Sequence, residues 1–187
     1  MKKEIGVVPT VFPMPVLMIA SYDENGVVDV MNAAWGTICG YDKIALCIGG
    51  HKTNENIEKT GAFTVALADA AHVKEADYFG MASGKMVADK FERTGMTAVK
   101  SAHVNAPVIE EFPLTMECEV AEVIQSENFH GVIGKIVNVV ADEAVLDAEG
   151  KVDAGKLNAL IFDQFGRSYY ASGEKTAGAW DAGKAFM

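Results

Sequence analysis

The chain has 187 residues, half of them hydrophobic, which is enough for one domain with a sizeable core. Its 26 acidic and 16 basic residues give a net charge of −10. This balance argues against nucleic acid or an anionic membrane as a partner, because both bind clustered lysine and arginine. Three cysteines without a CxxC spacing predict neither a disulfide framework nor a zinc site, and they favour a reducing cytoplasm. No uninterrupted apolar run reaches the about 18 residues of a membrane span.

In the first half of the chain, strand patterns alternate with short helical patterns. The strand patterns occupy 16–22, 27–30, 44–48 and 63–68. Asn25-Gly26 separates the first two strands, and this dipeptide is a strong signal for a β-hairpin turn. The helical patterns occupy 53–59, 71–81 and 86–94. In the last of these, Val87 and Phe91 are four residues apart and would share one face of a helix.

The second half of the chain is dominated by two long strands. Along 114–125, apolar and polar residues alternate until Glu122 stands where an apolar residue is due. A β-bulge or strong coiling at this point would explain the change of face, and closed barrels use both. The segment 131–140 predicts a second long strand, 147–150 a turn, and 168–171 a short last strand. This order predicts a mainly β, antiparallel barrel with inserted helices rather than a doubly wound sheet.

The common nucleotide and metal motifs are missing from the sequence. It has no GxGxxG after a strand, no GxSxG, and no HExxH or HxxxH pair among its four histidines. The segment 49–57, Gly-Gly-His-Lys-Thr-Asn-Glu-Asn-Ile, follows a buried strand pattern. Backbone N–H groups at such a turn can bind an anion, and Lys52 and Thr53 would add a charge and a hydroxyl donor. An ordinary capped helix after a turn is the alternative interpretation.

A tryptophan stands among small residues just after the predicted hairpin. The segment 32–36 reads Asn-Ala-Ala-Trp-Gly. Its indole is a candidate to cover a flat ring. The alternative is a tryptophan in the core or in a dimer interface, where a large aromatic side chain is commonly buried.

Several motifs recur in the order found in one protein family. They are Asn32 followed by Trp35, Lys52-Thr53 followed by Asn56-Ile57, Thr60-Gly61 before Phe63, Lys90-Phe91 before Thr94-Gly95, Pro107 before Glu117-Cys118-Glu119, His130 before Gly134-Lys135, and Tyr169-Tyr170. They cover the chain from about Pro13 to Tyr170. In these motifs and in their order, the chain resembles the flavin reductase-like family of FMN-binding split barrels, and within it the flavoredoxin group.

The resemblance implies a fold, a cofactor and a partner. The fold would be a split β-barrel of Greek-key topology, with one flavin reductase-like domain over 1–187. The partner would be a second copy of the chain, with one FMN per subunit near the interface of the homodimer. The residues that the resemblance assigns to the FMN site are Asn32, Ala33, Ala34, Trp35, Lys52, Thr53, Asn54, Lys90, His130, Phe165 and Tyr169.

Within that site, the resemblance implies two ends. Lys52, Thr53 and Asn54 would lie at the phosphate and ribityl chain, and Lys90 would supply a cation near the phosphate or the ring. Many family members have serine or arginine where His51 stands in this chain, so the donors at the phosphate are not fixed by the resemblance.

At the ring end, the segment 32–35 would lie near the isoalloxazine, and Phe165 or Tyr169 would form a wall of the ring pocket. His130 would lie at the cofactor pocket. Simpler interpretations stand beside these roles, since Lys90 would also suit a solvated helix face and His130 a strand end. We expect Cys39 and Cys47 to be buried, inert thiols.

The resemblance leaves three functions open. The first is an FMN-containing oxidoreductase that takes electrons from NAD(P)H. The second is an electron carrier of the flavoredoxin type, which exchanges electrons with a redox protein and has little NAD(P)H activity. The third is a flavin-binding module without catalysis. In all three, the cofactor would carry out the redox chemistry and the protein would orient and tune it, so we assign no catalytic residue.

Overall fold

The computed structural model describes residues 1–187, apart from the side chain of Ala185. The strands are β1 Met14–Pro15, β2 Leu17–Tyr22, β3 Val28–Ala33, β4 Gly36–Gly40, β5 Lys43–Cys47, β6 Ala62–Leu67, β7 Ala98–Lys100, β8 Pro107–Ile109, β9 Leu114–Gln125, β10 His130–Ala141, β11 Leu160–Asp163 and β12 Ser168–Ala171. The helices are α1 Lys52–Thr60, α2 Val73–Met81 and α3 Ala154–Leu157. The 3₁₀ segments are η1 Ala70–His72, η2 Glu92–Thr94, η3 Glu143–Val145 and η4 Ala182–Phe186.

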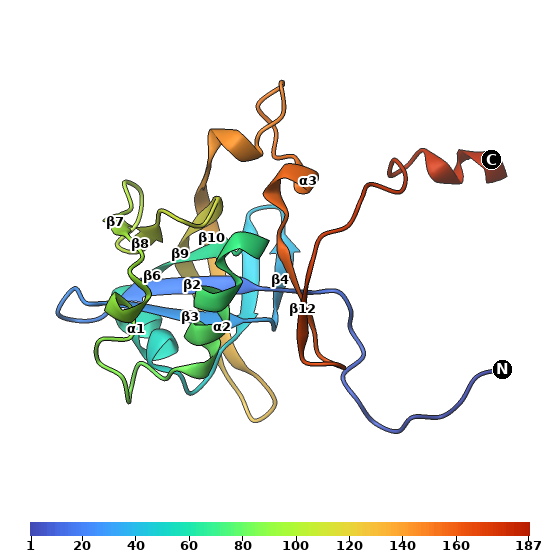
Figure 1. Cartoon of the computed structure of the whole chain (residues 1–187). Coiled ribbons are helices and arrows are strands. Elements are labelled where there is room, and N and C mark those ends of the chain that lie inside the picture. The colour runs from blue at the N-terminus through green and yellow to red at the C-terminus, as the bar shows by residue number, and fades with distance from the viewer.

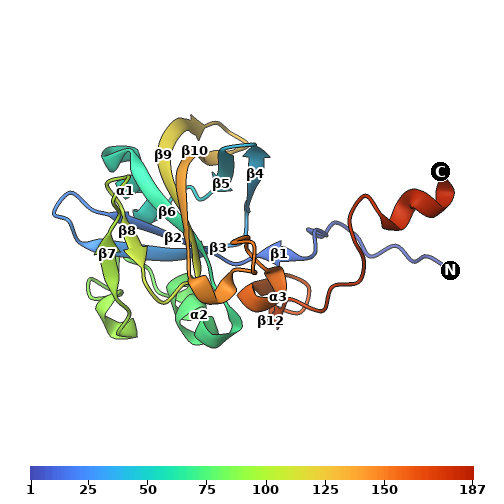
Figure 2. The same cartoon turned by 90° about the horizontal axis from the view of Figure 1, so that it is seen from above.

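Seven strands form one antiparallel sheet in the order β3-β2-β6-β9-β10-β5-β4. The sheet curls into a half-barrel, so that β9, β10, β5 and β4 arch away from β2 and β3 (Figures 1 and 2). A small sheet of β1, β11 and β12 and the hairpin β7-β8 complete the β-structure. The prediction of a mainly β antiparallel split barrel with inserted helices is therefore confirmed.

Strand β2 is buried on both of its faces. Alternate side chains of a strand point to opposite sides of the sheet. Met18 and Ala20 pack into one hydrophobic cluster with Phe79 of α2. Leu17 and Ile19 pack into the other, inside the barrel. The sheet therefore has a helix-covered outer face beside β2 and β3 and an apolar interior.

Two β-bulges interrupt the pairing of the long strands β9 and β10. Ile133 pairs with Glu122 and Gly134 pairs with Val120, so Ala121, which lies between Val120 and Glu122, has no partner. A second irregularity lies between Ile136 and Asn138 of β10. The bulge predicted beside Glu122 is confirmed, and the extra local twist helps the sheet to curl.

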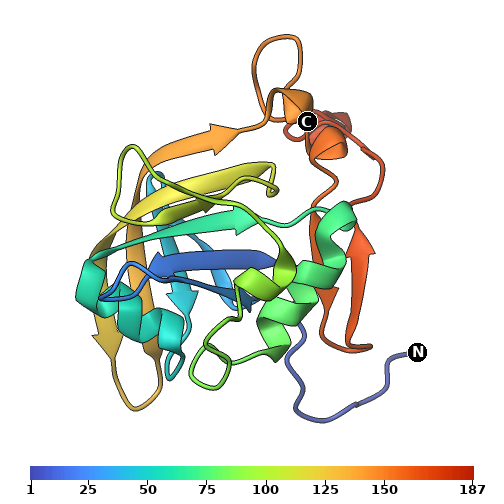
Figure 3. The ribbon, with the colours of Figure 1, turned by 60° about the vertical axis from the view of Figure 1, so that its left-hand side comes forward.

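Helices α1 and α2 both lie beside β2 and β3 (Figure 3). The expected strands, the hairpin turn at Gly26 and the helical segments at α1 and α2 are confirmed within a few residues. The helix predicted over 86–94 is wrong, because this segment forms turns and ends in η2. Lys90 and Phe91 are both buried there, and the Lys90 ammonium reaches the carbonyl of Phe79. Long-range packing therefore decides the path of this segment.

The termini extend away from the barrel on the same side (Figure 1). Before β1 and after β12 most side chains are exposed, including Trp180.

The prediction of buried thiols is wrong for Cys39, which is exposed on the edge strand β4, and Cys47 is only half-buried. Along the described chain, no helix combines the length and the hydrophobicity needed to cross a membrane.

A glycine in β10 tests the close packing of the curled sheet. A Cβ on Gly131 would overlap the carbonyl oxygen of Leu46 on the neighbouring strand, whereas a Cβ on Gly173 would meet no atom within 4 Å. We expect Gly131→Ala to lower the free energy of unfolding by about 1–3 kcal/mol, because backbone must shift to admit the methyl group. Gly173→Ala should be neutral. Urea unfolding of both variants measures the difference, and equal stabilities would contradict this packing.

Candidate functional site

Two neighbouring cavities lie where α2 meets the ends of β3 and α1. The first, which we call the lysine cavity, has a volume of about 230 Å³ and is lined by Asp29, Lys52, Thr53 and Lys90 among others. The second, the tyrosine cavity, has a volume of about 350 Å³ and is lined by Asn32, Ala34, Trp35, Asp77, Phe162 and Tyr169. Gly80 and Met81, in the last turn of α2, line both cavities. The two cavities therefore adjoin along this turn.

The lysine cavity receives the N-terminal end of α1. Gly50 has a φ of +82°, which lets the chain turn sharply out of the strand β5. His51 then precedes the helix in an extended conformation and makes no side-chain cap. The first N–H groups of α1 therefore lack a side-chain acceptor, and the positive end of the helix dipole adds to their attraction for an anion.

Charged side chains of both signs line the lysine cavity. The Thr53 hydroxyl donates a hydrogen bond of 2.5 Å to the Asp29 carboxylate, which is buried. The Lys52 ammonium lies 3.9 Å from the Asp23 carboxylate in a partly exposed ion pair. A bound anion would therefore share the cations of this cavity with a resident carboxylate.

Lys90 is buried, which corrects the alternative of a solvated helix face. Its ammonium donates a hydrogen bond of 3.0 Å to the carbonyl of Phe79, near the C-terminal end of α2, and lies 5.7 Å from the centre of the Phe79 ring. Burial holds the pKa of Lys90 below its ordinary value, while the charge of Asp29 acts in the opposite direction. The fold thus keeps a desolvated cation beside Lys52.

The tyrosine cavity combines aromatic rings with a short chain of hydrogen bonds. The Tyr169 hydroxyl donates to the Asp77 carboxylate over 3.0 Å and lies 3.5 Å from the Asn32 amide nitrogen. The Asn32 amide also donates to the carbonyl of Ala76 over 3.0 Å. Trp35 is 56% exposed, so in this chain it is not a core residue. The cavity offers flat apolar walls and a few oriented polar groups, as small-molecule sites do.

Other residues that the resemblance assigns to the FMN site lie outside both cavities. Ala33 packs against the hydrophobic cluster inside the barrel. Asn54 is one residue beyond Thr53 on α1 and so points about 100° away, where its amide bonds Glu58 and contacts His130. The Oδ1 atom of Asn54 has no hydrogen-bond partner among the described residues. Phe165 is exposed and packs against Phe12.

The cavities also contain residues that the sequence patterns did not identify: Asp29, Asp77, Gly80, Met81, Ser83 and Gly84. Asp77, Gly80 and Met81 are spaced to share one face of α2. Gly84 lies so close to the Asp29 carboxylate that a Cβ would overlap it. A glycine within the predicted helix 71–81 was the available local signal, because glycine in a helix often permits close approach.

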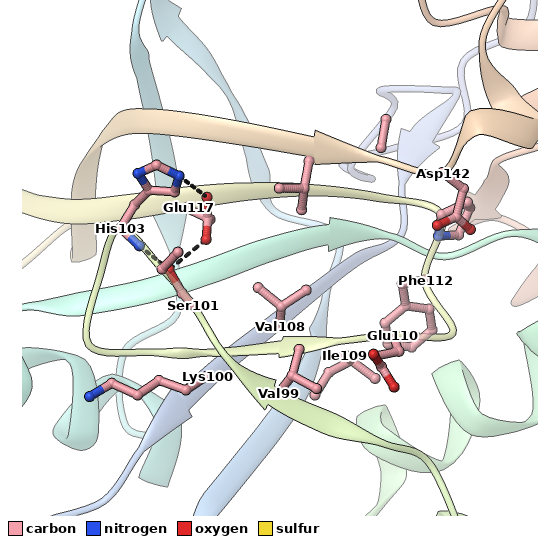
Figure 4. Close-up of a pocket in the computed structure, with 14 residues that line it drawn as sticks. Val99, Lys100, Ser101, His103, Val108, Ile109, Glu110, Phe112, Glu117 and Asp142 are labelled. Carbon is pink, nitrogen blue, oxygen red and sulfur yellow. Dashed lines mark hydrogen bonds and ion pairs between the residues drawn. The ribbon is translucent and has the colours of Figure 1, made fainter.

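Another cavity, of about 360 Å³, lies under the hairpin β7-β8 (Figure 4). The buried Glu117 accepts hydrogen bonds from the Ser101 hydroxyl and the Asn138 amide, and His103 lies 4.0 Å from it. The Ser101 hydroxyl accepts the backbone N–H of His103. Because these polar groups satisfy one another, we interpret the cluster as a brace that holds the hairpin on β9. None of the residues assigned to the FMN site lines this cavity.

The curled antiparallel sheet and the two adjoining cavities define a split barrel with a site of the size and chemistry of a nucleotide-like cofactor. The family model for the flavin reductase-like domain matches residues 10–171, and the chain belongs to this family. Membership confirms the resemblance inferred from the motifs and supports a flavin cofactor.

Solved structures and curated proteins with similar sequences agree with this assignment. The flavoredoxin of Desulfovibrio vulgaris (Miyazaki F) is 36% identical, covers 98% of this chain and 100% of its own, and superposes with a TM-score of 0.93. The flavoredoxin from Methanosarcina acetivorans is 26% identical, covers both chains fully and has a TM-score of 0.88. The uncharacterized protein YwrF of Bacillus subtilis (strain 168) is 26% identical over 153 residues, which is 75% of this chain and 74% of that protein.

The residues of the two cavities fit an FMN molecule. The uncapped N–H groups of α1, with Lys52 and Lys90, are the donor set that a phosphate requires. The aromatic walls of the tyrosine cavity suit a flat ring system. Their joint volume lies in the range of about 300–1,000 Å³ usual for small-molecule sites.

The buried position of Lys90 predicts a pH dependence of stability. Its pKa in the folded protein is below the 10.5 of the free side chain. At a pH between the lowered pKa of the folded protein and 10.5, the unfolded chain binds more protons at Lys90 than the folded chain does. The free energy of unfolding of the flavin-free protein therefore increases as the pH rises through this range. Lys90→Met should lack this increase. Urea unfolding at several values from about pH 7 to about pH 10.5 measures the difference between the two proteins.

Lys59→Met is the control for this experiment. Lys59 is exposed, and its hydrogen bond to Glu24 raises its pKa, so the contribution of Lys59 to stability decreases as the pH rises. The Lys59→Met protein still contains Lys90 and should therefore keep the gain in stability toward alkaline pH that Lys90→Met lacks. Parallel pH profiles for the wild-type and Lys90→Met proteins would contradict the burial of a charged Lys90.

Proposed function

We propose that the two cavities bind one FMN, with its phosphate in the lysine cavity and its isoalloxazine ring in the tyrosine cavity, and that the protein works as a flavin-dependent oxidoreductase. The observation that carries the proposal is the way the last turn of α2 joins the two cavities. A cation-lined end and an aromatic end, at the two sides of Gly80 and Met81, match the two ends of FMN.

At the phosphate end, we assign binding to the first N–H groups of α1 and to Lys52 and Lys90. The Thr53 hydroxyl donates to the Asp29 carboxylate, and in this proposal it holds that carboxylate in place beside the cofactor. Asn54 and His130 support the start of α1 from the other side, since both contact each other beside Glu58. In this proposal they position the helix rather than touch the cofactor.

At the ring end, Asn32, Ala34, Trp35 and Tyr169 form the walls. Trp35 leads directly into the edge strand β4, and the backbone there is held by the bond from the Cys47 N–H to the Trp35 carbonyl, 2.8 Å. A fixed backbone on one side and the Tyr169 hydroxyl on the other would orient the ring. When bound, FMN supplies the electron transfer, and these residues keep it in a single orientation.

The electron donor distinguishes the candidate functions. An oxidoreductase would accept hydride from NAD(P)H, whereas an electron carrier would be reduced by a redox protein. The electron carrier is the second candidate, because the chain is 36% identical to a flavoredoxin. Anaerobic addition of NADH or NADPH to the FMN-loaded protein distinguishes the two candidates. Only an oxidoreductase that uses NAD(P)H would quickly lose the visible absorption of its oxidised flavin. A protein that no reductant of either kind bleaches would support the non-catalytic flavin module.

Loss of the Lys52 charge tests the site of the phosphate. Lys52→Ala should weaken FMN binding on the order of 10- to 150-fold, because charge-assisted hydrogen bonds contribute about 1.5–3 kcal/mol. Riboflavin lacks the phosphate, so its affinity should change little. Titration of both flavins, followed by the quenching of their fluorescence, measures the two affinities.

Lys59→Ala is a matched control, because Lys59 lies at the other end of α1 and pairs with Glu24, next to the partner of Lys52. It should leave both flavin affinities unchanged. Equal weakening of FMN and riboflavin by Lys52→Ala would place the phosphate elsewhere, and a wild-type protein that retains no FMN after desalting would contradict the proposal.

We further propose a homodimer, with the ring end of each site near the subunit interface. Large apolar side chains are exposed around the tyrosine cavity and the edge strand, namely Val11, Phe12, Trp35, Ile38 and Tyr41. Two of them, Val11 and Trp35, line an apolar hollow of about 400 Å³ together with Met14 and Phe129. Exposed large apolar side chains beside such a hollow are typical of an association surface. A second copy is the occupant that the family resemblance implies.

The dimer makes a hydrodynamic prediction. Sedimentation equilibrium of the FMN-loaded protein should give the mass of two chains, and Ile38→Asp with Tyr41→Asp should shift the mass toward one chain, because buried unpaired carboxylates oppose association. A wild-type protein that is monomeric at micromolar concentration and still retains FMN would contradict the interface.

A further inference from the structure

Asp77 brings a negative charge into the tyrosine cavity. It shares one face of α2 with Gly80 and Met81, because the three are spaced by three and four residues, and all three line the cavity. The Tyr169 hydroxyl of β12 donates to its carboxylate over 3.0 Å. Among the described residues, no lysine, arginine or histidine forms an ion pair with Asp77. The charge is therefore oriented but not neutralised by a cation.

The proton of this pair stays on the tyrosine. Burial raises the pKa of Tyr169 to about 12, and the hydrogen bond and the charge of Asp77 act in the same direction. Near neutral pH the phenol therefore keeps its proton and is the donor to the Asp77 carboxylate. Asn32, on β3, approaches the same hydroxyl at 3.5 Å and is anchored on the Ala76 carbonyl at 3.0 Å. Three elements of the fold thus fix where the carboxylate points.

We infer that Asp77 lowers the midpoint potential of the bound flavin. The inference rests on the proposed binding of FMN with its ring in the tyrosine cavity. Two-electron reduction adds two electrons and takes up one or two protons from solvent, and uptake of only one leaves the ring negatively charged. A carboxylate beside the ring raises the energy of that charge and favours the oxidised cofactor. The lysines act at the opposite end, on the phosphate.

A structural role for Asp77 is the competing explanation. Through Tyr169 it ties β12 to α2, and this brace would hold the cavity wall in place without any effect on redox chemistry. The two explanations differ in what they expect from the tyrosine. Tyr169→Phe breaks the brace but leaves the carboxylate in the cavity with one donor fewer.

The test measures midpoint potentials of the FMN-loaded protein by equilibration with reference dyes under anaerobic reduction. Asp77→Asn removes the charge and keeps an acceptor for the tyrosine. It should strengthen the binding of reduced relative to oxidised FMN at least about tenfold, which equals a rise of about 30 mV for a two-electron couple. Glu75→Gln is the matched control, because it makes the same charge change on α2 but outside both cavities, and its potential should stay with the wild type.

Tyr169→Phe keeps the inference testable if Asp77→Asn does not fold. The carboxylate loses its hydrogen-bond donor, so the potential should fall below that of the wild type. Potentials that stay at the wild-type value in Asp77→Asn, or that rise in Tyr169→Phe, would overturn the role of Asp77. Those results require a wild-type protein that holds FMN, whereas failure of the wild type to retain FMN would overturn the proposed function and this inference with it.

Discussion

The burial of β2 on both faces is the constraint on which the rest of the structure depends. A strand with apolar side chains on both sides needs cover on both sides. The curl of the sheet, helped by the bulges of β9 and β10, closes the barrel over Leu17 and Ile19. Helix α2 covers Met18 and Ala20 from outside, through Phe79. Because α2 is held there, its last turn lies against the end of β3, and the two cavities form along this contact.

The lysine cavity concentrates positive charge, although the chain as a whole is acidic. A chain with a net charge of −10 places Lys52 and Lys90 in one cavity. Burial of Lys90 in this cavity lowers its pKa, because a buried ammonium loses hydration. Its hydrogen bond to the Phe79 carbonyl, near the C-terminal end of α2, offsets part of this loss. At the other end of the site, Asp77 and Tyr169 provide a carboxylate and a neutral phenol. The proposed orientation of FMN rests on the cations at one end and on the aromatic walls at the other, where Asp77 adds a negative charge.

Local patterns were enough to predict most strands, the turns at Gly26 and Gly150, and the start of α1 with Lys52 and Thr53. These features depend on residue alternation, on turn residues and on the composition of a helix start. The same reasoning failed over 86–94, where an apparent helical spacing gave way to the packing of Lys90 and Phe91. It also missed β1, β4, β7, β8 and β11, which have only two to five residues each and so carry too little alternation of apolar and polar side chains to be recognised.

The sequence by itself determined the family, the mainly β architecture and the position of the start of α1, because each follows from residues that are close together or from motifs in a fixed order. Only the tertiary structure decided which side chains share the site. It turned Asn54 and His130 away from the cavities, buried Lys90 inside one of them, and brought Asp77 to Tyr169 across 92 residues of chain. Contacts of this kind depend on how the sheet closes and on how α2 packs against it. Neither can be predicted from the spacing of residues along the chain.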